Sequence, residues 1–108
     1  MTRPDLRLST EERTAFLREA IAAGEPAAFA ISGADGYPVV GLVECQLDGE
    51  ALRLVGDVPV DGTAACLVVE RGATYDDITA VVARGVVQNR RMPLDDVVSF
   101  AFAKLAPP

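Results

Sequence analysis

The side chains that could bind a ligand or react are few, and arginine provides most of them. The sequence contains no histidine, and Lys104 is its only lysine. The lack of histidine removes the most common general base, the most common metal ligand and every Ser-His or Cys-His nucleophile. No lysine is available for Schiff-base chemistry outside the C-terminal tail. We therefore expect no zinc site, no histidine-ligated heme and no P-loop chemistry, and the sequence identifies no catalytic residue.

Arg84 is the most informative arginine because it interrupts an otherwise apolar strand pattern. Burying an unpaired guanidinium is costly, so this side chain needs a partner. Two interpretations remain open. Arg84 binds an anionic ligand or a cofactor phosphate at an interface, or it forms a structural ion pair with Glu44, Glu70 or a carboxylate of a partner subunit.

The other arginines have simpler explanations. Arg53 projects opposite to Leu52 and Leu54, so it faces solvent or an interface. Arg90 and Arg91 form a basic pair that could clamp an anion, although such a pair is more typical of a solvated turn.

Three further polar residues could contact a ligand. Tyr37 could stack on a planar ligand, but a tyrosine at the start of a hairpin more often packs across strands. Asp57 and Asp61 lie in one loop, and two carboxylates are too few for calcium, which takes six or more ligands. We therefore predict a turn at these aspartates and no metal site.

Cys45 and Cys66 lie in apolar runs, outside any CxxC pattern. This placement indicates two reduced core thiols, with a disulfide or a reactive thiol as the alternative.

Composition restricts the class of protein. A chain of 108 residues forms one domain, and one half of its residues are hydrophobic, which predicts a packed core. The net charge of −6 argues against nucleic acid or an anionic membrane as partner. No apolar run is long enough to span a membrane, and no signal-peptide pattern opens the chain, so we expect a cytoplasmic protein.

The stretch from Ala27 to Leu47 predicts an antiparallel β-hairpin. Two apolar runs flank Gly33-Ala34-Asp35-Gly36, whose residues favour a tight reversal. Further alternating runs predict six strands in all: Ala27–Ser32, Tyr37–Leu47, Ala51–Val55, Thr63–Glu70, Ile78–Gln88 and Val97–Leu105. The segment Gln88–Pro93 is expected to form a basic turn.

One helix precedes these strands. Ser9-Thr10-Glu11-Glu12 has the pattern of a capping box, and Gly24 and Pro26 end the helix. The expected buried stripe contains Ala15, Phe16, Ala20 and Ile21, with Leu17 at its edge. Residues 1–8 form an extended arm and residues 9–105 the domain, a mainly β (α+β) fold in which one N-terminal helix caps a six-stranded antiparallel barrel.

Several strands are apolar on both faces, particularly the fourth and fifth. A monomeric barrel has a wet outer face, so a second apolar face implies a partner, most simply another copy of the chain. We predict a homodimer.

The order of these features resembles the pyridoxamine 5′-phosphate oxidase-like split β-barrel family. The resemblance covers roughly residues 8–105 and has four parts: the helix entered by LSTEERTAFL, the hairpin AAFAISGADGYPVVGLVECQLDGEALRL, the paired strands ACLVVERG and TYDDITAVVARGVV, and the closing DDVVSFAFAKL, similar to the last strand of the flavin and deazaflavin branch. Each motif is weak alone, and their order and spacing carry the resemblance.

The resemblance implies a split β-barrel dimer with flavin-type sites at the subunit interface. Family members bind FMN or a deazaflavin and mostly perform two-electron redox chemistry, while some branches bind heme. The flavin ring usually lies along the strand that corresponds to Val39–Val43. The resemblance thus makes Val39, Val40, Gly41, Leu42 and Val43 candidate cofactor-binding residues. Arg53 and Arg84 join them as the cations that could face a ligand or an interface.

The sequence departs from the family after the third strand. Members usually place a basic residue there to hold the cofactor phosphate, whereas this chain has GDVPVDG with Asp57 and Asp61. Two aspartates repel a phosphate. The helix that many members insert between the last two strands is also absent.

Two classes of function follow. In the first, an oxidoreductase binds a flavin or deazaflavin, and the cofactor supplies the chemistry. In the second, a cofactor-free dimeric barrel serves as a small-molecule binding or scaffold module, or its cavity is reused for non-redox chemistry.

Overall fold

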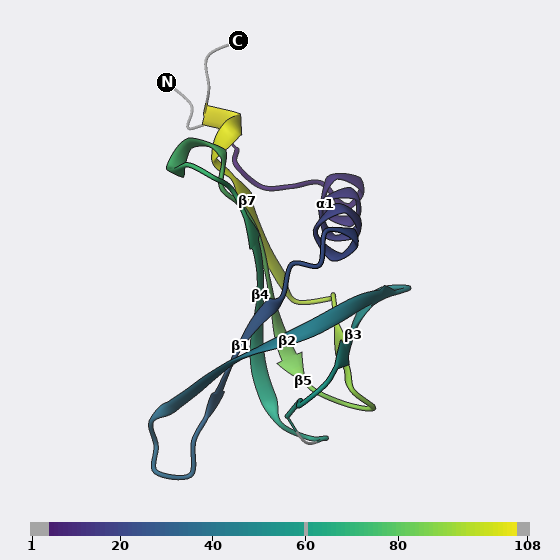
Figure 1. Cartoon of the computed structure of the whole chain (residues 1–108), viewed down its shortest axis with the longest axis vertical. Helices are drawn as coiled ribbons and strands as arrows, with labels where there is room; N and C mark the ends of the chain where they lie inside the picture. Colours follow the sequence, from purple (N-terminus) through teal and green to yellow (C-terminus); the bar gives the residue numbers. More distant parts are fainter. Residues whose placement is uncertain (1–4, 60, 106–108) are drawn as a thin grey trace.

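A computed structural model of the chain describes residues 5–59 and 61–105. Within these residues the protein is mainly β, with one helix and a single curled antiparallel sheet (Figure 1). The helix is α1 (Thr10–Ala22), and the strands are β1 (Ala27–Ser32), β2 (Pro38–Asp48), β3 (Ala51–Val55), β4 (Ala64–Arg71), β5 (Thr79–Val86), β6 (Arg91–Pro93) and β7 (Val97–Ala101). Short 3-10 turns, η1 (Tyr75–Asp77) and η2 (Phe102–Leu105), precede β5 and follow β7.

The prediction of six strands is wrong, because the sheet has seven in the order β6-β3-β2-β1-β4-β5-β7. The additional strand is β6, which lies in the segment expected to be a turn. Asn89 and Arg90 have φ angles of 51° and 59°, so the chain reverses in two residues and Gln88 pairs with Arg91. Arg91–Pro93 then pairs with β3. The short length, the proline and the arginines of β6 hide this strand in the sequence.

β6, at one edge of the sheet, returns to β5, near the other edge. A β-carbon built at Gly85 of β5 would lie 3.4 Å from the Met92 sulfur of β6. The sheet is therefore curled into a half-barrel with β6 folded back towards β5, and its inner face encloses the core.

β2 is the longest strand and changes partner at its midpoint. Residues Pro38–Val43 pair with β1, and residues Glu44–Asp48 pair with β3 on the opposite edge. Each half of β2 thus has one paired edge and one edge without a strand among the described residues. The β1–β2 hairpin extends away from the body of the protein (Figure 1).

The core lies between the inner face of the sheet and α1. Its largest fully buried side chains come from four strands, the helix and one loop: Leu17, Leu52, Leu54, Leu67, Val69, Val81, Val87 and Met92. The alternation of buried and exposed residues along β3 and β4 is the two-residue period that the sequence predicts.

The predicted capping box of α1 is confirmed. The Ser9 hydroxyl accepts a hydrogen bond from the Glu12 backbone N–H at 3.1 Å, and Glu12 accepts one from the Ser9 N–H at 2.9 Å. The buried stripe differs from the prediction, because Leu17 is fully buried whereas Ala15 is exposed. Leu17 and Ala20 point to the sheet, and the larger leucine, not Ala15, marks the centre of the stripe.

The two ends of the domain lie beside β7. β7 ends at Ala101 instead of Leu105, because the chain turns into η2 there. The Ala101 N–H donates to the Leu6 carbonyl, and the Leu8 N–H donates to the Ser99 hydroxyl. Residues 5–8 of the expected arm thus run along the outer edge of β7, and residues 1–4 lie outside the described residues.

Candidate functional site

The strand expected to form a ligand wall divides its side chains between two faces. Val43 is buried in the core, whereas Val40 and Leu42 lie on the outer face and are 69% and 70% exposed. Val39 and Gly41 share the inner face with Val43, since they pair with Ile31 and Phe29 of β1. The structure therefore leaves Val40 and Leu42 as the residues of this strand that an outer-face ligand can contact.

Polar groups follow these two residues along the same face. Glu44 and Gln46 are the next two residues on this face of β2, and both are exposed. Gln46 lies four residues beyond Leu42, about 13 Å at the usual rise of a strand. Gln46 pairs with Arg53 of β3, and Arg53 pairs with Arg91 of β6, so the three side chains form a row across the outer face. The prediction that Arg53 faces away from Leu52 and Leu54 is confirmed.

The row places two guanidinium groups on directly opposed residues. Like charges at such positions destabilise a sheet unless an anion neutralises them. Arg91 forms an ion pair with Asp48. Arg53 has no ion pair among the described residues and is exposed, so it can accept an anionic group from a ligand.

A third arginine reaches the acidic loop after β3. The Arg90 guanidinium donates to the Gly56 carbonyl, at the start of the loop. Asp61, near the end of the loop, accepts a hydrogen bond from the Asn89 N–H at 3.0 Å, so this aspartate has a structural role as predicted for turn residues. The loop itself supplies no cation, but β6 and its turn bring Arg90 and Arg91 beside β3. Sequence spacing gives no signal for this long-range contact.

Arg84 does not join this group. Its guanidinium lies 3.3 Å from an Asp96 oxygen, and both side chains are more than half exposed. The partner is thus neither Glu44 nor Glu70, because the segment before β7 carries Asp96 to the end of β5. Such an exposed pair contributes little to stability.

The two cysteines lie on opposite faces of the sheet. Cys45 pairs with Leu54 and is buried in the core, where burial raises the pKa of its thiol. Cys66 pairs with Arg84 on the outer face and is half-buried. Both thiols are free, as predicted, but only Cys45 is a core residue.

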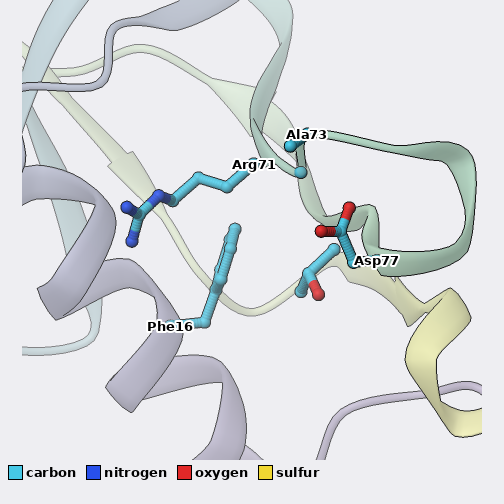
Figure 2. A pocket seen from close by; sticks show the side chains of 6 residues that line it. Phe16, Arg71, Ala73 and Asp77 are labelled. Atoms are coloured by element: carbon cyan, nitrogen blue, oxygen red, sulfur yellow. The ribbon is translucent and has the colours of Figure 1, made fainter.

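A cavity of about 340 Å³ lies between α1 and the turn that follows β4. Figure 2 shows Phe16 between Arg71 and Asp77, with the Arg71 guanidinium turned towards the helix. Arg71 lies 3.8 Å from Glu25, and Asp77 accepts the Thr74 N–H, so both charged groups already have partners. This cavity offers no convergent polar groups for a ligand.

A wider groove of about 700 Å³ runs between α1 and the β2–β3 turn. Its charged lining combines two arginines, Arg13 of α1 and Arg91 of β6, with three carboxylates, Asp48, Glu50 and Asp95. The carboxylates are in excess, so this groove does not favour an anion. Among the described residues there is no cluster of three side chains that could hold a metal ion, and no helix there is long and apolar enough to cross a membrane.

No protein-family model matches the chain, and no curated protein matches its sequence. Among solved structures, the chain is similar to the crystal structure of the conserved hypothetical protein Rv2991 from Mycobacterium tuberculosis. The TM-score is 0.77 at 16% sequence identity, and the match covers 100% of this chain and 94% of that chain. At this identity the likeness shows a common fold and nothing of the activity.

Proposed function

We propose that the chain is a homodimeric split β-barrel protein, similar to the pyridoxamine 5′-phosphate oxidase-like family, that binds FMN or a deazaflavin at the dimer interface. The reaction class that fits it is hydride or electron transfer. One observation carries the proposal: the outer face of β2 and β3 holds both an exposed apolar strip, Val40 and Leu42, and an exposed cation, Arg53, with Glu44 between them on β2.

The strip and the cation match the two parts of such a ligand. A planar ring packs on aliphatic side chains, and a phosphate pairs with a guanidinium in bidentate geometry. Arg91 lies beside Arg53 and adds positive potential, although Asp48 already neutralises part of it. The cation that the loop after β3 lacks is thus provided by β3 and β6.

The protein contributes binding and orientation to this reaction. A bound flavin or deazaflavin supplies the hydride chemistry. Val40 and Leu42 would hold the ring and exclude water from one of its faces, and Arg53 would hold the phosphate. The chain has no histidine to move a proton, which suits hydride transfer better than hydrolysis.

A fluorescence titration tests the proposal. We expect the purified protein to quench FMN or a deazaflavin in a saturable manner. Arg53→Gln should weaken binding by about 10-fold or more, because one charge-assisted contact is lost. Arg18→Gln, an exposed arginine of α1, is the matched control and should leave the affinity unchanged. If the fluorescence of neither ligand is quenched when the protein is in large molar excess, the proposal is overturned.

A cofactor-free binding or scaffold module is the second candidate. The observation that favours it is the loop after β3, where Asp57 is exposed and Asp61 is engaged with Asn89. In that case the visible absorption of the protein purified from cells should show no flavin, and the protein should still be a dimer in light scattering.

A further inference from the structure

The free edge of the β1–β2 hairpin lies on the N-terminal half of β2. The Gly33 N–H donates to the Tyr37 carbonyl, and this pair continues the register in which Ala27 pairs with Val43. Hydrogen-bonded and non-bonded pairs alternate in an antiparallel ladder, so Val39, Gly41 and Val43 direct their backbone groups at β1. Val40 and Leu42 therefore direct their N–H and C=O groups away from it.

On that side no strand of the described chain meets them. β3 pairs with β2 only from Glu44 onward, and Gly56, with a φ of 102°, turns the chain away after Val55. The same alternation of hydrogen-bonded and non-bonded pairs continues between β2 and β3. Leu54 lies opposite Cys45 and does not bond to it, because the Leu54 N–H donates to the Arg90 carbonyl on the other side of β3. The backbone groups of Val40 and Leu42 are thus open to pairing.

Apart from Pro38 at one end, this edge has none of the features that usually protect an exposed strand. The segment Pro38–Val43 carries no charge, and Val40 and Leu42 expose more than two thirds of their surface. Natural edges commonly carry charged residues or bulges that prevent pairing. Only Pro38, which lacks an N–H, blunts one end of it.

We propose that a second copy of the chain pairs antiparallel with this edge, with the two-fold axis beside Val40. Val40 then exchanges two hydrogen bonds with Val40 of the second copy, and each Leu42 N–H donates to a Pro38 carbonyl, which needs no N–H from the proline. A self-complementary edge is what a two-fold contact requires. The register also keeps most of the second strand clear of β3, whose pairing starts at Glu44.

The inference rests on the proposed function, since it specifies how the proposed homodimer forms, and it makes the binding site shared. Val40, Leu42 and Pro38 lie on the outer face of each copy. Pairing at Val40 joins them into one apolar floor, with an Arg53 at each end. Each copy then completes the ring-binding surface of the other, which is incomplete in one chain.

Disulfide trapping tests the register directly. In a Cys66→Ser background, Val40→Cys places two thiols on opposed residues about 5.5 Å apart between Cα atoms, within disulfide reach. We expect it to form a covalent dimer under mild oxidation. Leu42→Cys is the matched control, because each Leu42 opposes Pro38 and lies two residues farther from the axis, so it should remain monomeric on a non-reducing gel. Equal cross-linking of both variants, or of neither, would overturn the proposal.

Proline substitution tests the backbone contact. Val40→Pro removes an N–H that has no acceptor among the described residues of the single chain and would donate one hydrogen bond across the axis, so a dimer of the variant loses two. The dimer dissociation constant should rise about 30-fold, the loss of two hydrogen bonds. Val40→Ala keeps the N–H and should raise the constant less than Val40→Pro. An unchanged constant for Val40→Pro in sedimentation equilibrium, with the circular dichroism spectrum retained, would contradict edge pairing.

Neither measurement uses a flavin. Cross-linking at Val40 in a protein that fails the flavin titration would uphold the edge pairing and overturn only the proposed ligand. Flavin binding without cross-linking at Val40 would support the proposed ligand and overturn the edge pairing.

Discussion

Gly41 shows how closely one residue of β2 is fitted to its neighbour. It lies opposite Phe29 of β1, and a β-carbon at Gly41 would lie 2.7 Å from the Phe29 Cζ atom. The aromatic ring therefore occupies the space that any side chain at this position would need. A glycine without a side chain weakens a strand, and the ring that covers Gly41 compensates for this.

Gly41→Ala should destabilise the fold by about 1–3 kcal/mol in denaturant unfolding, because the Phe29 ring must move out of its packed position. Gly85→Ala is the matched control. Its new β-carbon would meet the Met92 sulfur at 3.4 Å, an ordinary contact, so little change is expected. In a Phe29→Leu background the cost of Gly41→Ala should fall, since the two residues are coupled. An equal cost in both backgrounds would show that the ring is not the cause.

The two thiols should differ in reactivity. The thiolate is the reactive form, and burial of Cys45 both raises the pKa of its thiol and blocks access to it. A thiol reagent at about pH 8 should thus modify one cysteine per chain quickly in the native protein and the second only on unfolding. Cys66→Ser should remove the fast phase, and Cys45→Ser should leave it. A fast phase that survives Cys66→Ser would contradict this assignment.

The arginines illustrate what the sequence can and cannot predict about single side chains. The direction of Arg53 follows from the two-residue period of a strand, which is a local property. The partner of Arg84 and the position of Arg91 beside Arg53 depend on which strands meet, and these contacts join residues far apart in the chain. The composition can show that cations are scarce, but it cannot show where the sheet gathers them.

In addition to its packing on the sheet, α1 is linked to the C-terminal turn by one carboxylate, that of Glu12. Glu12 accepts the Ser9 N–H and also the Lys104 ammonium group, which reaches from η2 and donates to the Arg7 carbonyl as well. The hydrogen bond from the Ser9 backbone, followed by the contact with Lys104, lowers the pKa of Glu12 below its usual value of 4.5. One side chain thus joins the start of the helix to the C-terminal turn.

This arrangement makes the docking of α1 sensitive to acid. A carboxyl group whose pKa is lower in the folded chain contributes stability above its unfolded pKa, and this contribution is lost as the pH falls through the folded pKa. The free energy of unfolding should therefore fall between about pH 5 and pH 3 more steeply in the wild type than in Glu12→Gln. Glu11→Gln is the matched control and should follow the wild type. Parallel curves for wild type and Glu12→Gln would contradict the role of Glu12.

The helix and the strands differ in how well their ends can be predicted. The capping box and the glycine turns are local patterns, and β1 and β3 have the predicted bounds. β6 was missed because a three-residue strand is specified by its neighbour and not by its own sequence. η2 was missed for a similar reason, since Phe102 turns away to stack on Tyr75, with the ring centroids 4.8 Å apart.

At the scale of the whole molecule, alternating apolar residues and turns predict a mainly β antiparallel fold with one leading helix, and this is correct. The curl of the sheet and its strand order depend on pairings such as β1 with β4 and β3 with β6, which no local pattern specifies. The second apolar surface was expected mainly on the fourth and fifth strands. In the structure, strongly exposed apolar side chains of this surface lie instead on the β1–β2 hairpin, at Tyr37, Val40 and Leu42.

The change of partner along β2 has a consequence for the exchange of amide hydrogens with solvent. Gly41 and Val43 have their N–H groups in the ladder with β1 and should exchange slowly, whereas Val40 and Leu42 should exchange quickly in a single chain. Protection factors along one continuous strand should therefore alternate residue by residue up to Val43. Beyond Val43 the even-numbered residues become the protected ones. The N–H groups of Glu44 and Gln46 bond to β3, whereas the Cys45 N–H points to the opposite edge of β2. Nuclear magnetic resonance at low protein concentration measures this pattern, and slowed exchange at Val40 and Leu42 on concentration would report the arrival of a second chain.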